Sequence, residues 1–292
     1  MYELIQLTER DYYIDCPAKI GLIRTGEDEV ALIDSGSDKD AGKKVLRILE
    51  SNGWKLTAIF NTHSHADHIG GNRFLQDRTG CRIYARGLEC TYTNSPALEP
   101  MGLYGGQPFK DLKHKFLLAQ ESAAQPLSQA ALPEGMELLS MPGHSFDMVG
   151  FKTKDGTAYI ADAVSSEETL AKYGIGYLWD AEASVQTLET LRGLDAKIFV
   201  PAHASVTDNI KALVQMNIDT IRAVQEKLTE LCRTPRTFEE ILKTVFDDYG
   251  LVMTAQQYVL IGSTIRSYLS GLYEKGVLTF SFEDNVMRWK AV

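Results

Sequence analysis

The sequence predicts an α+β protein in which layered sheets are flanked by helices and a small helical unit follows at the C-terminal end. From residue 1 to about 205, short β-rich runs alternate with helical patterns. Their spacing fits both hairpins and crossovers, which predicts a mixed sheet. After a break at Pro235 the chain changes to two helical patterns and a hairpin. With 292 residues, 44% of them hydrophobic, the chain can form one large domain plus an appendage.

The predicted strands are apolar or β-branched runs that end at turn residues. They span residues 2–7, 19–25, 29–34, 58–62, 81–85, 136–141, 149–153, 158–162 and 197–202. The pair Asp155-Gly156 predicts a hairpin between two of them. Helical patterns span 38–51, 66–78, 182–193 and 208–231. The segment 94–135 is rich in proline and glycine without a clear period, so we expect a long loop that walls a pocket.

The C-terminal unit begins with Thr237 and Glu240 in capping-box spacing. Helices are predicted over 237–249 and 254–275, and a hairpin turned at Glu283-Asp284-Asn285 follows. This order of elements is winged-helix-like, and we place the domain boundary between 1–205 and 206–292. Residues 205–292 carry 10 Lys and Arg against 11 Asp and Glu, which leaves no basic face for nucleic acid. We therefore expect a structural role or a homodimer contact.

The overall charge excludes several classes of protein. Thirty Lys and Arg against 39 Asp and Glu give a net charge of -9, which disfavours nucleic acid and anionic membranes as partners. No apolar run approaches the length of a membrane span, and Glu3 and Arg10 interrupt the N-terminal pattern, unlike a signal peptide.

The four cysteines show no CxxC spacing. We expect reduced thiols and a cytoplasmic protein.

One motif concentrates the chemistry of the chain. Three of the six histidines, His63, His65 and His68, lie within six residues together with Asp67. Imidazoles and carboxylates are ligands that suit zinc, iron or manganese. His63 and His65 alternate along extended chain after an apolar strand, so they can point the same way. Asp67 and His68 begin the helical pattern that follows, so the four side chains predict a metal site at a sheet edge.

Three later residues also follow predicted strands. His144 stands in the segment MPGHS, Asp162 in AYIADAV and His203 in FVPAH. Each alone is typical of a turn or a cap. Together they place five of the six histidines at strand ends, as a site assembled along one edge requires.

With these motifs, the sequence resembles the metallo-β-lactamase superfamily, whose hallmark is HxHxDH after a strand. The resemblance covers roughly residues 5–205 and includes ALIDSG at 31–36. It implies a four-layer αββα sandwich, with 1–205 as the metal-binding catalytic domain. The motif region is similar to the glyoxalase II-like branch, whereas the C-terminal tail is similar to that of the β-lactamase-like 2 hydrolases.

The resemblance also implies the roles of individual residues. One divalent metal ion would be held by His63, His65 and His144, a second by Asp67, His68 and His203, and Asp162 would bridge them. Asp34 would orient a ligand through a hydrogen bond. His63, His65 and Asp67 are the expected catalytic residues. Zinc is the first choice of metal, with iron or manganese as alternatives.

The expected reaction is hydrolysis of a small ester, thioester or lactone. Two divalent ions about 3.5–4 Å apart share a water and lower its pKa from 15.7 towards 7. Two ions, two aspartates and one hydroxide sum to a local charge of about +1, which makes an anionic small-molecule substrate plausible. RNA phosphodiester hydrolysis, suggested by the tail, is the second alternative, and an iron-dependent sulfur dioxygenase is the third. A binding module without catalysis is the least favoured, because no ligand position is missing.

Two groups of aromatic and apolar residues are candidates for pocket walls. Met101, Tyr104, Pro108 and Phe109 lie in the long loop, and Tyr173, Tyr177 and Trp179 follow soon after Asp162. Both groups are equally compatible with ordinary packing.

Overall fold

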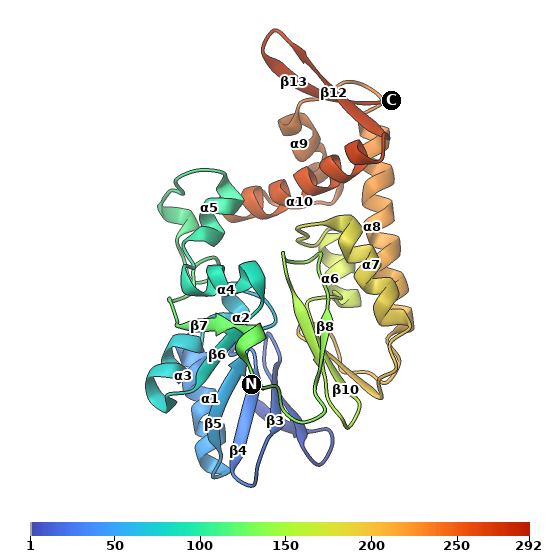
Figure 1. The fold of residues 1–292 in the computed structure, drawn as a ribbon. Coiled ribbons are helices and arrows are strands. Elements are labelled where there is room, and N and C mark those ends of the chain that lie inside the picture. Colours follow the sequence, from blue (N-terminus) through green and yellow to red (C-terminus); the bar gives the residue numbers. More distant parts are fainter. Residues whose placement is uncertain (1) are drawn as a thin grey trace.

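The computed structural model describes residues 2–292 and has two sheets packed face to face with helices on both outer sides (Figure 1). The first sheet has seven strands in chain order: β1 (Glu3–Gln6), β2 (Asp11–Asp15), β3 (Ile20–Arg24), β4 (Glu29–Ile33), β5 (Lys55–Phe60), β6 (Arg82–Ala85) and β7 (Ala124–Pro126). Pairing is antiparallel from β1 to β4 and parallel from β4 to β7. The sheet is therefore mixed, as predicted.

The second sheet has four strands in the order β11-β10-β9-β8. Their bounds are β8 (Glu137–Ser140), β9 (Val149–Lys152), β10 (Thr157–Ala161) and β11 (Ile198–Pro201). β9 and β10 form the predicted hairpin, in which Gly156 has φ 96°. β10 and β11 are parallel, so their carboxyl ends meet at one edge of the sheet.

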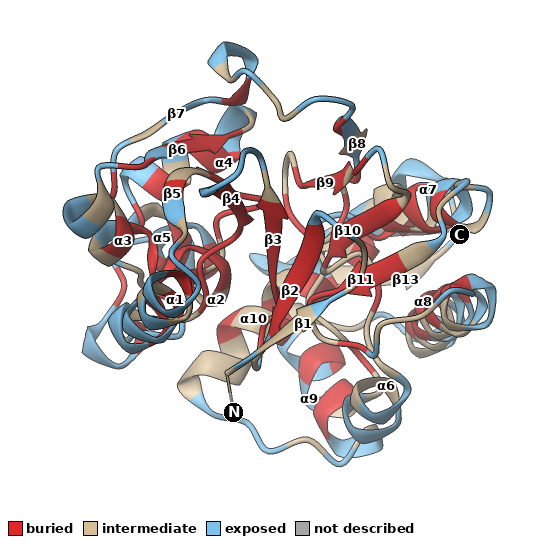
Figure 2. Cartoon of the chain, turned by 90° about the horizontal axis from the view of Figure 1, so that it is seen from below, coloured by how far each residue is buried: buried red, intermediate tan, exposed pale blue. Residues whose placement is uncertain are grey.

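Strand alternation separates the chain into layers. In β4, Val30 and Leu32 pack into the cluster under the helices α1 (Lys39–Ser51) and α3 (Asn72–Thr79), whereas Ala31 and Ile33 face the second sheet. The second sheet is covered on its other side by α7 (Ala181–Arg192) and α8 (Lys211–Leu231). Figure 2 shows buried residues in the strands between these helices. The four-layer sandwich is confirmed.

The two sheets are also joined by a buried tyrosine. Tyr159 of β10 donates its hydroxyl hydrogen bond to the backbone carbonyl of Tyr12, at 2.8 Å, across the interface between the sheets. Its ring lies so close to Gly21 that a Cβ atom there would be 2.7 Å away. Glycine at position 21 therefore allows the first sheet to approach the second.

Several shorter elements were not predicted. Helices α4 (Gly87–Asn94) and α6 (Glu167–Tyr173) and strand β2 lie in segments without a marked period. The segment 94–135, expected to be a loop, contains α5 (Leu98–Tyr104), β7 and the 3-10 turns η1 (Lys110–Leu112) and η2 (Leu127–Gln129). Elements this short give too few residues for a periodic pattern.

The helix predicted over 66–78 is divided into α2 (Ala66–Ile69) and α3. The break falls at Gly70 and Gly71, which pass against the loop after β4. A Cβ atom at Gly70 would lie 2.2 Å from the carbonyl oxygen of Ser37, and one at Gly71 would lie 2.3 Å from that of Ser35. The prediction of a continuous helix was therefore wrong, because close backbone packing decides the path here.

The C-terminal unit consists of α9 (Phe238–Asp248), α10 (Ala255–Glu274) and the hairpin β12 (Leu278–Glu283) with β13 (Val286–Ala291). The capping box of Thr237 and Glu240 is present. Asp284 and Asn285 turn the hairpin with φ values of 49° and 63°. Ile241 and Ile265 join one apolar cluster with Ile160 of β10, so the unit shares a core with the second sheet. The domain boundary at 205/206 stays a prediction.

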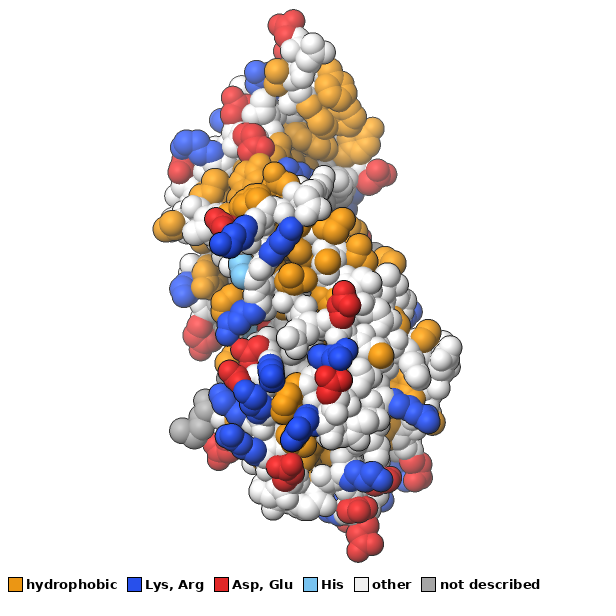
Figure 3. Space-filling view, turned by 90° about the vertical axis from the view of Figure 1, so that its left-hand side faces the viewer, with side chains coloured by type: hydrophobic (Ala, Val, Ile, Leu, Met, Phe, Trp, Pro, Cys, Tyr) orange, Lys and Arg blue, Asp and Glu red, His pale blue; other side chains and the backbone are white. Residues whose placement is uncertain are grey.

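The hairpin projects from the rest of the molecule and exposes apolar side chains (Figure 3). Phe282 is 68% exposed and Phe280 36%. The homodimer expected from the sequence stays a prediction. Within residues 2–292, no helix is both long enough and apolar enough to span a membrane.

Replacing Gly70 by alanine should destabilise the protein by at least about 2 kcal/mol, because the new Cβ atom would overlap the Ser37 carbonyl. Gly193→Ala is the matched control, since its Cβ atom would meet nothing closer than 3.8 Å. Urea unfolding of both variants measures the difference. Equal free energies of unfolding would contradict the role of this contact.

Candidate metal centre

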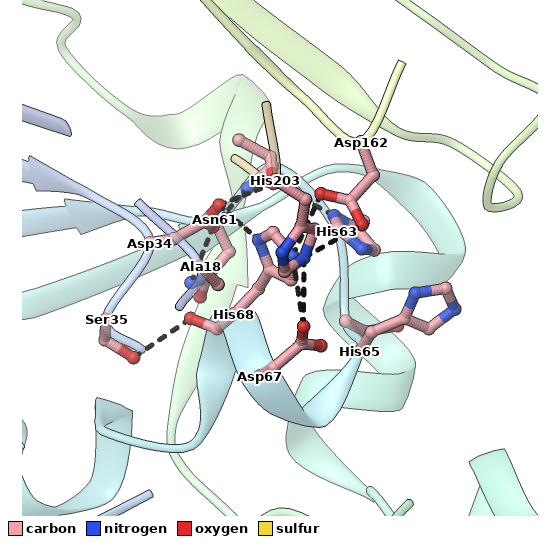
Figure 4. A network of polar contacts seen from close by, with 12 residues as sticks. Ala18, Asp34, Ser35, Asn61, His63, His65, Asp67, His68, Asp162 and His203 are labelled. Carbon is pink, nitrogen blue, oxygen red and sulfur yellow. Dashed lines mark hydrogen bonds and ion pairs between the residues drawn. The ribbon is translucent and has the colours of Figure 1, made fainter. Parts of the chain in front are cut away.

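The structure brings all seven predicted ligand residues to one edge of the sandwich. Figure 4 labels His63, His65, Asp67, His68, Asp162 and His203 there. His63 and His65 follow β5, and Asp67 and His68 lie in α2. The three later ligand residues, His144, Asp162 and His203, come after β8, β10 and β11. Both sheets therefore contribute donors to a single site.

A first group of donors consists of His63, His65 and His144. The Nε2 atom of His144 and the Nδ1 atom of His65 are 3.0 Å apart. The rings of His63 and His65 meet edge to face with centroids 4.5 Å apart. Three imidazoles this close are suited to one shared cation.

A second group consists of Asp67, His68 and His203. The Nε2 atom of His203 lies 3.1 Å from Oδ2 of Asp67, and that of His68 lies 3.8 Å from the same oxygen. His203 is the most exposed of these histidines, so this group faces the solvent more than the first.

Asp162 lies between the two groups. Its Oδ1 atom is 3.1 Å from Nε2 of His68, and its Oδ2 atom is 3.4 Å from Nε2 of both His144 and His203. Donors bound to one tetrahedral zinc ion at 2.0–2.1 Å are roughly 3.3 Å apart. The spacing of these atoms therefore matches donors that share cations.

The donor atoms also lack other partners. Nε2 of His63, Nε2 of His68 and Oδ1 of Asp162 are buried without a well-oriented hydrogen bond. Leaving Nε2 of His63 buried and unpaired costs about 1–3 kcal/mol, and Nε2 of His68 and Oδ1 of Asp162 face each other at 3.1 Å without good hydrogen-bond geometry. The residues present thus fit divalent metal ions.

Hydrogen-bond partners on the outer side of the ligand histidines fix which ring nitrogen points towards the metal centre. Nδ1 of His68 bonds Oδ2 of Asp34 at 2.8 Å, as the resemblance implied for Asp34. Nδ1 of His144 faces the backbone carbonyl of Tyr177 at 3.2 Å, and Nδ1 of His203 faces that of Pro17 at 2.8 Å. These rings are held with Nε2 towards the centre. His65 differs, because its Nδ1 atom faces the centre.

Asp34 is buried and holds more than one neighbour. It accepts hydrogen bonds from the backbone N–H of Thr62 at 2.8 Å and from its hydroxyl at 2.7 Å. The Thr62 hydroxyl is in turn 3.0 Å from Nδ1 of His63. Asp34 itself has φ 65°, a strained conformation for a residue other than glycine. The strained residue is the one that anchors, through hydrogen bonds to Thr62 and His68, the loops that carry the ligands of the first sheet.

Glu89 of α4 is a buried carboxylate that the sequence analysis missed. Its Oε2 atom accepts hydrogen bonds from the backbone N–H and hydroxyl of Ser64, at 2.9 and 2.7 Å. Its Oε1 atom accepts them from the Ser145 hydroxyl and the Asp147 N–H, at 2.6 and 3.0 Å. Glu89 therefore ties together the loops that carry His63, His65 and His144. The serines beside the histidines were the available sequence signal.

A second missed carboxylate is Glu99 of α5. Its Oε1 atom lies 3.7 Å from Nε2 of His65, on the side of the ring away from the centre. Burial and the nearby charge of Glu89 raise the pKa of Glu99 to about 8.

The histidine pKa values divide the site into two halves. Burial lowers the pKa of His65 and of His144 to about 4 and that of His63 well below its usual range. Attraction to Asp162 raises the pKa of His203 to about 10. Burial opposes charge on His68, but Asp162, Asp67 and Asp34 outweigh it and raise its pKa. Without metal at pH 7, the first group is neutral and His68 and His203 carry protons.

The two groups of residues expected to form pocket walls lie in different places in the structure. Tyr173 and Tyr177 line a cavity that opens beside His144, Asp162 and His203, whereas Trp179 lines a separate groove along α10. Met101, Tyr104 and Phe109 are 40–45% exposed and do not line this cavity. Of the two alternatives left open for them, lining of this cavity is not seen, since apolar composition alone does not say which face a side chain occupies.

Histidine and carboxylate donors from both sheets thus define a candidate metal centre at the edge of a four-layer sandwich. The family model of the Metallo-beta-lactamase superfamily matches residues 13–203, a range that includes all seven predicted ligands. The chain therefore belongs to the metallo-β-lactamase superfamily.

Curated relatives are hydrolases by name. A hydroxyacylglutathione hydrolase from Methylococcus capsulatus is 31% identical over 174 residues, which cover 58% of this chain and 57% of that protein. An atrochrysone carboxyl ACP thioesterase from Aspergillus fumigatus is 25% identical over 238 residues, covering 80% and 65%. The chain spans less than two thirds of the length of these first relatives.

Solved structures share the whole architecture. A metallo-beta-lactamase family protein from Thermus thermophilus has a TM-score of 0.73 at 18% identity and covers 100% of this chain and 98% of its own. A beta-lactamase domain protein from Burkholderia ambifaria has a TM-score of 0.70 at 15% identity, covering 99% and 94%. The likeness extends through the C-terminal unit.

Glu89→Gln should lower metal affinity about 10–100-fold, because an amide has only one oxygen for the four donors that Glu89 now satisfies. Glu137→Gln is the control, since Glu137 is exposed and faces only Lys152 at 3.5 Å. Competition with a chromogenic chelator measures affinity, and the visible spectrum of the cobalt-substituted protein reports ligand geometry. Wild-type affinity and spectrum in Glu89→Gln would contradict the positioning role.

Full loading with zinc at pH 7 should release about three protons, because His68 and His203 must each lose one to bind metal and the shared water loses one when the cations lower its pKa. The zinc affinity of the group Asp67, His68 and His203 should fall as the pH decreases, because protons compete with the metal. The group His63, His65 and His144 should show less of this dependence, because its histidines are already neutral. Calorimetric titration in buffers of different ionisation enthalpy counts the protons. In His203→Ala the release should drop by about one, and metal binding without proton release would refute the assignment.

Proposed function

We propose that this protein is a binuclear metal-dependent hydrolase that cleaves small thioesters or esters. The observation that carries the proposal is the set of seven donors in two groups, with Asp162 between them, beside an open cavity. Residues 1–205 supply all seven donors, and residues 206–292 supply part of the cavity wall.

Two bound divalent cations would supply a nucleophile from water at neutral pH and polarise the carbonyl group of the substrate. His63, His65 and His144 would hold one cation, and Asp67, His68 and His203 the other. Asp162, which lies between the two groups, would be shared by both cations. Asp34 and Glu89 hold these side chains in place before the substrate arrives.

The thioester class is favoured by the relatives, since a hydroxyacylglutathione hydrolase and an acyl carrier protein thioesterase both act on thioesters by name. Zinc is the first choice because histidine nitrogens and carboxylate oxygens are its common ligands. Lactone hydrolysis uses the same chemistry and remains part of the proposal.

RNA hydrolysis is a weaker alternative for this site. A bound phosphodiester backbone would call for lysine or arginine around the cavity. Among the described residues that line it, none is basic apart from the ligand histidines. An acyl substrate therefore fits the site better than a polyphosphate.

Protein purified without added metal should contain about two zinc ions per chain and hydrolyse an acetyl thioester. His65→Ala and Asp162→Ala should reduce turnover on the order of a thousandfold, since each removes a donor to the cations. Asp195→Ala, which changes an exposed residue, is the control. Elemental analysis and a panel of thioester, ester, lactone and RNA substrates provide the readouts. RNA cleavage without thioester turnover, or one iron ion without any hydrolysis, would overturn the proposal.

A further inference from the structure

A cavity of about 400 Å³ opens directly from the candidate metal centre. His144, Asp162 and His203 form the part of its lining nearest the metal ligands. The volume lies near the lower end of the range for small-molecule sites, roughly 300–1,000 Å³. A group held there would extend away from a carbonyl placed at the centre.

The remaining wall is mostly apolar and comes from two parts of the chain that are distant in sequence, residues 164–177 and 251–261. Val164 and Ile175 lie on either side of α6, Leu251 precedes α10, and Leu260 and Ile261 lie on α10 itself. Val164, Ile175 and Ile261 are buried. In Figure 1, α10 crosses above the domain that carries the metal ligands. The C-terminal unit therefore closes one side of the cavity.

The polar groups on this wall are uncharged. Ser165, Thr169 and Gln257 are neutral, and Asp162 is the only carboxylate in the described lining. Within that same lining, lysine and arginine are absent. A carboxylate or phosphate on the part of the substrate bound here would lose its hydration without gaining a countercharge.

We propose that this cavity binds the acyl group of the substrate and selects neutral aliphatic chains of short to medium length. The proposal rests on the thioester hydrolase function above and names its substrate class. Each methylene group buried against this wall should raise kcat/KM about fourfold until the cavity is full. A charged acyl group of the same length should be disfavoured.

The test uses the metal-loaded full chain and a series of S-acyl N-acetylcysteamine thioesters from acetyl to dodecanoyl. We expect kcat/KM to rise with chain length and then level off, and butyryl to exceed succinyl at least about tenfold. Leu260→Phe should move the preferred chain to shorter lengths, and Leu260→Ala should move it to longer ones. Ser270→Phe places the same phenylalanine side chain at an exposed position of α10 outside the cavity lining and should leave the preference unchanged.

Binding of the product carboxylates, from acetate to decanoate, is measured by calorimetry as a second readout. Their dissociation constants should fall about fourfold per methylene, and Leu260→Phe should weaken decanoate more than acetate. Equal rates and affinities along the series, or a preference for succinyl, would overturn the acyl-chain proposal alone. Absence of thioester hydrolysis would overturn the proposed function, while the carboxylate affinities would still decide what the cavity binds.

Discussion

The metal centre depends on buried negative charge at the junction of the two sheets. Asp34 holds His68 and Thr62 on the side of the first sheet, and Glu89 joins Ser64 of that loop to Ser145 of the second sheet. A buried carboxylate is stable only when hydrogen bonds replace its hydration. Each of these two therefore requires the ligand loops to be in place, and the loops in turn are fixed by the carboxylates.

This mutual dependence explains how strands from different sheets can form one site. The donors lie on loops, which are the most mobile parts of a sandwich. Burial of the loop ends against Asp34 and Glu89 restricts them without using the donor atoms themselves, because Nε2 of His63 and of His68 stay unpaired. The hydrogen bonds of Asp34 and Glu89 thus help to arrange the ligand loops, and the contact from Tyr159 to Tyr12 joins the second sheet to the first.

Many of the strands and the first ligand motif could be predicted from the sequence, because strand patterns and histidine spacing are local signals. The strands at 29–34 and 149–162, and the grouping of His63, His65 and His68, are visible in short windows. The serines beside the histidines signal a partner but do not identify Glu89, since it lies 25 and 56 residues away and an isolated glutamate in a helix looks like a surface residue. The break at Gly70 and Gly71 likewise depends on a backbone contact with a distant loop.

The C-terminal unit is better understood as part of the site than as an appendage. The Thr264 hydroxyl of α10 accepts a hydrogen bond from the backbone N–H of Leu178 at 3.1 Å, and the neighbouring carbonyl of Tyr177 faces Nδ1 of His144. The same helix supplies Leu260 and Ile261 to the cavity. A change in the packing of α10 would therefore alter both the orientation of a ligand candidate and the shape of the cavity beside the metal centre. Substrate range in this architecture can evolve through a helix that contributes no metal ligand, while the ligand loops stay unchanged.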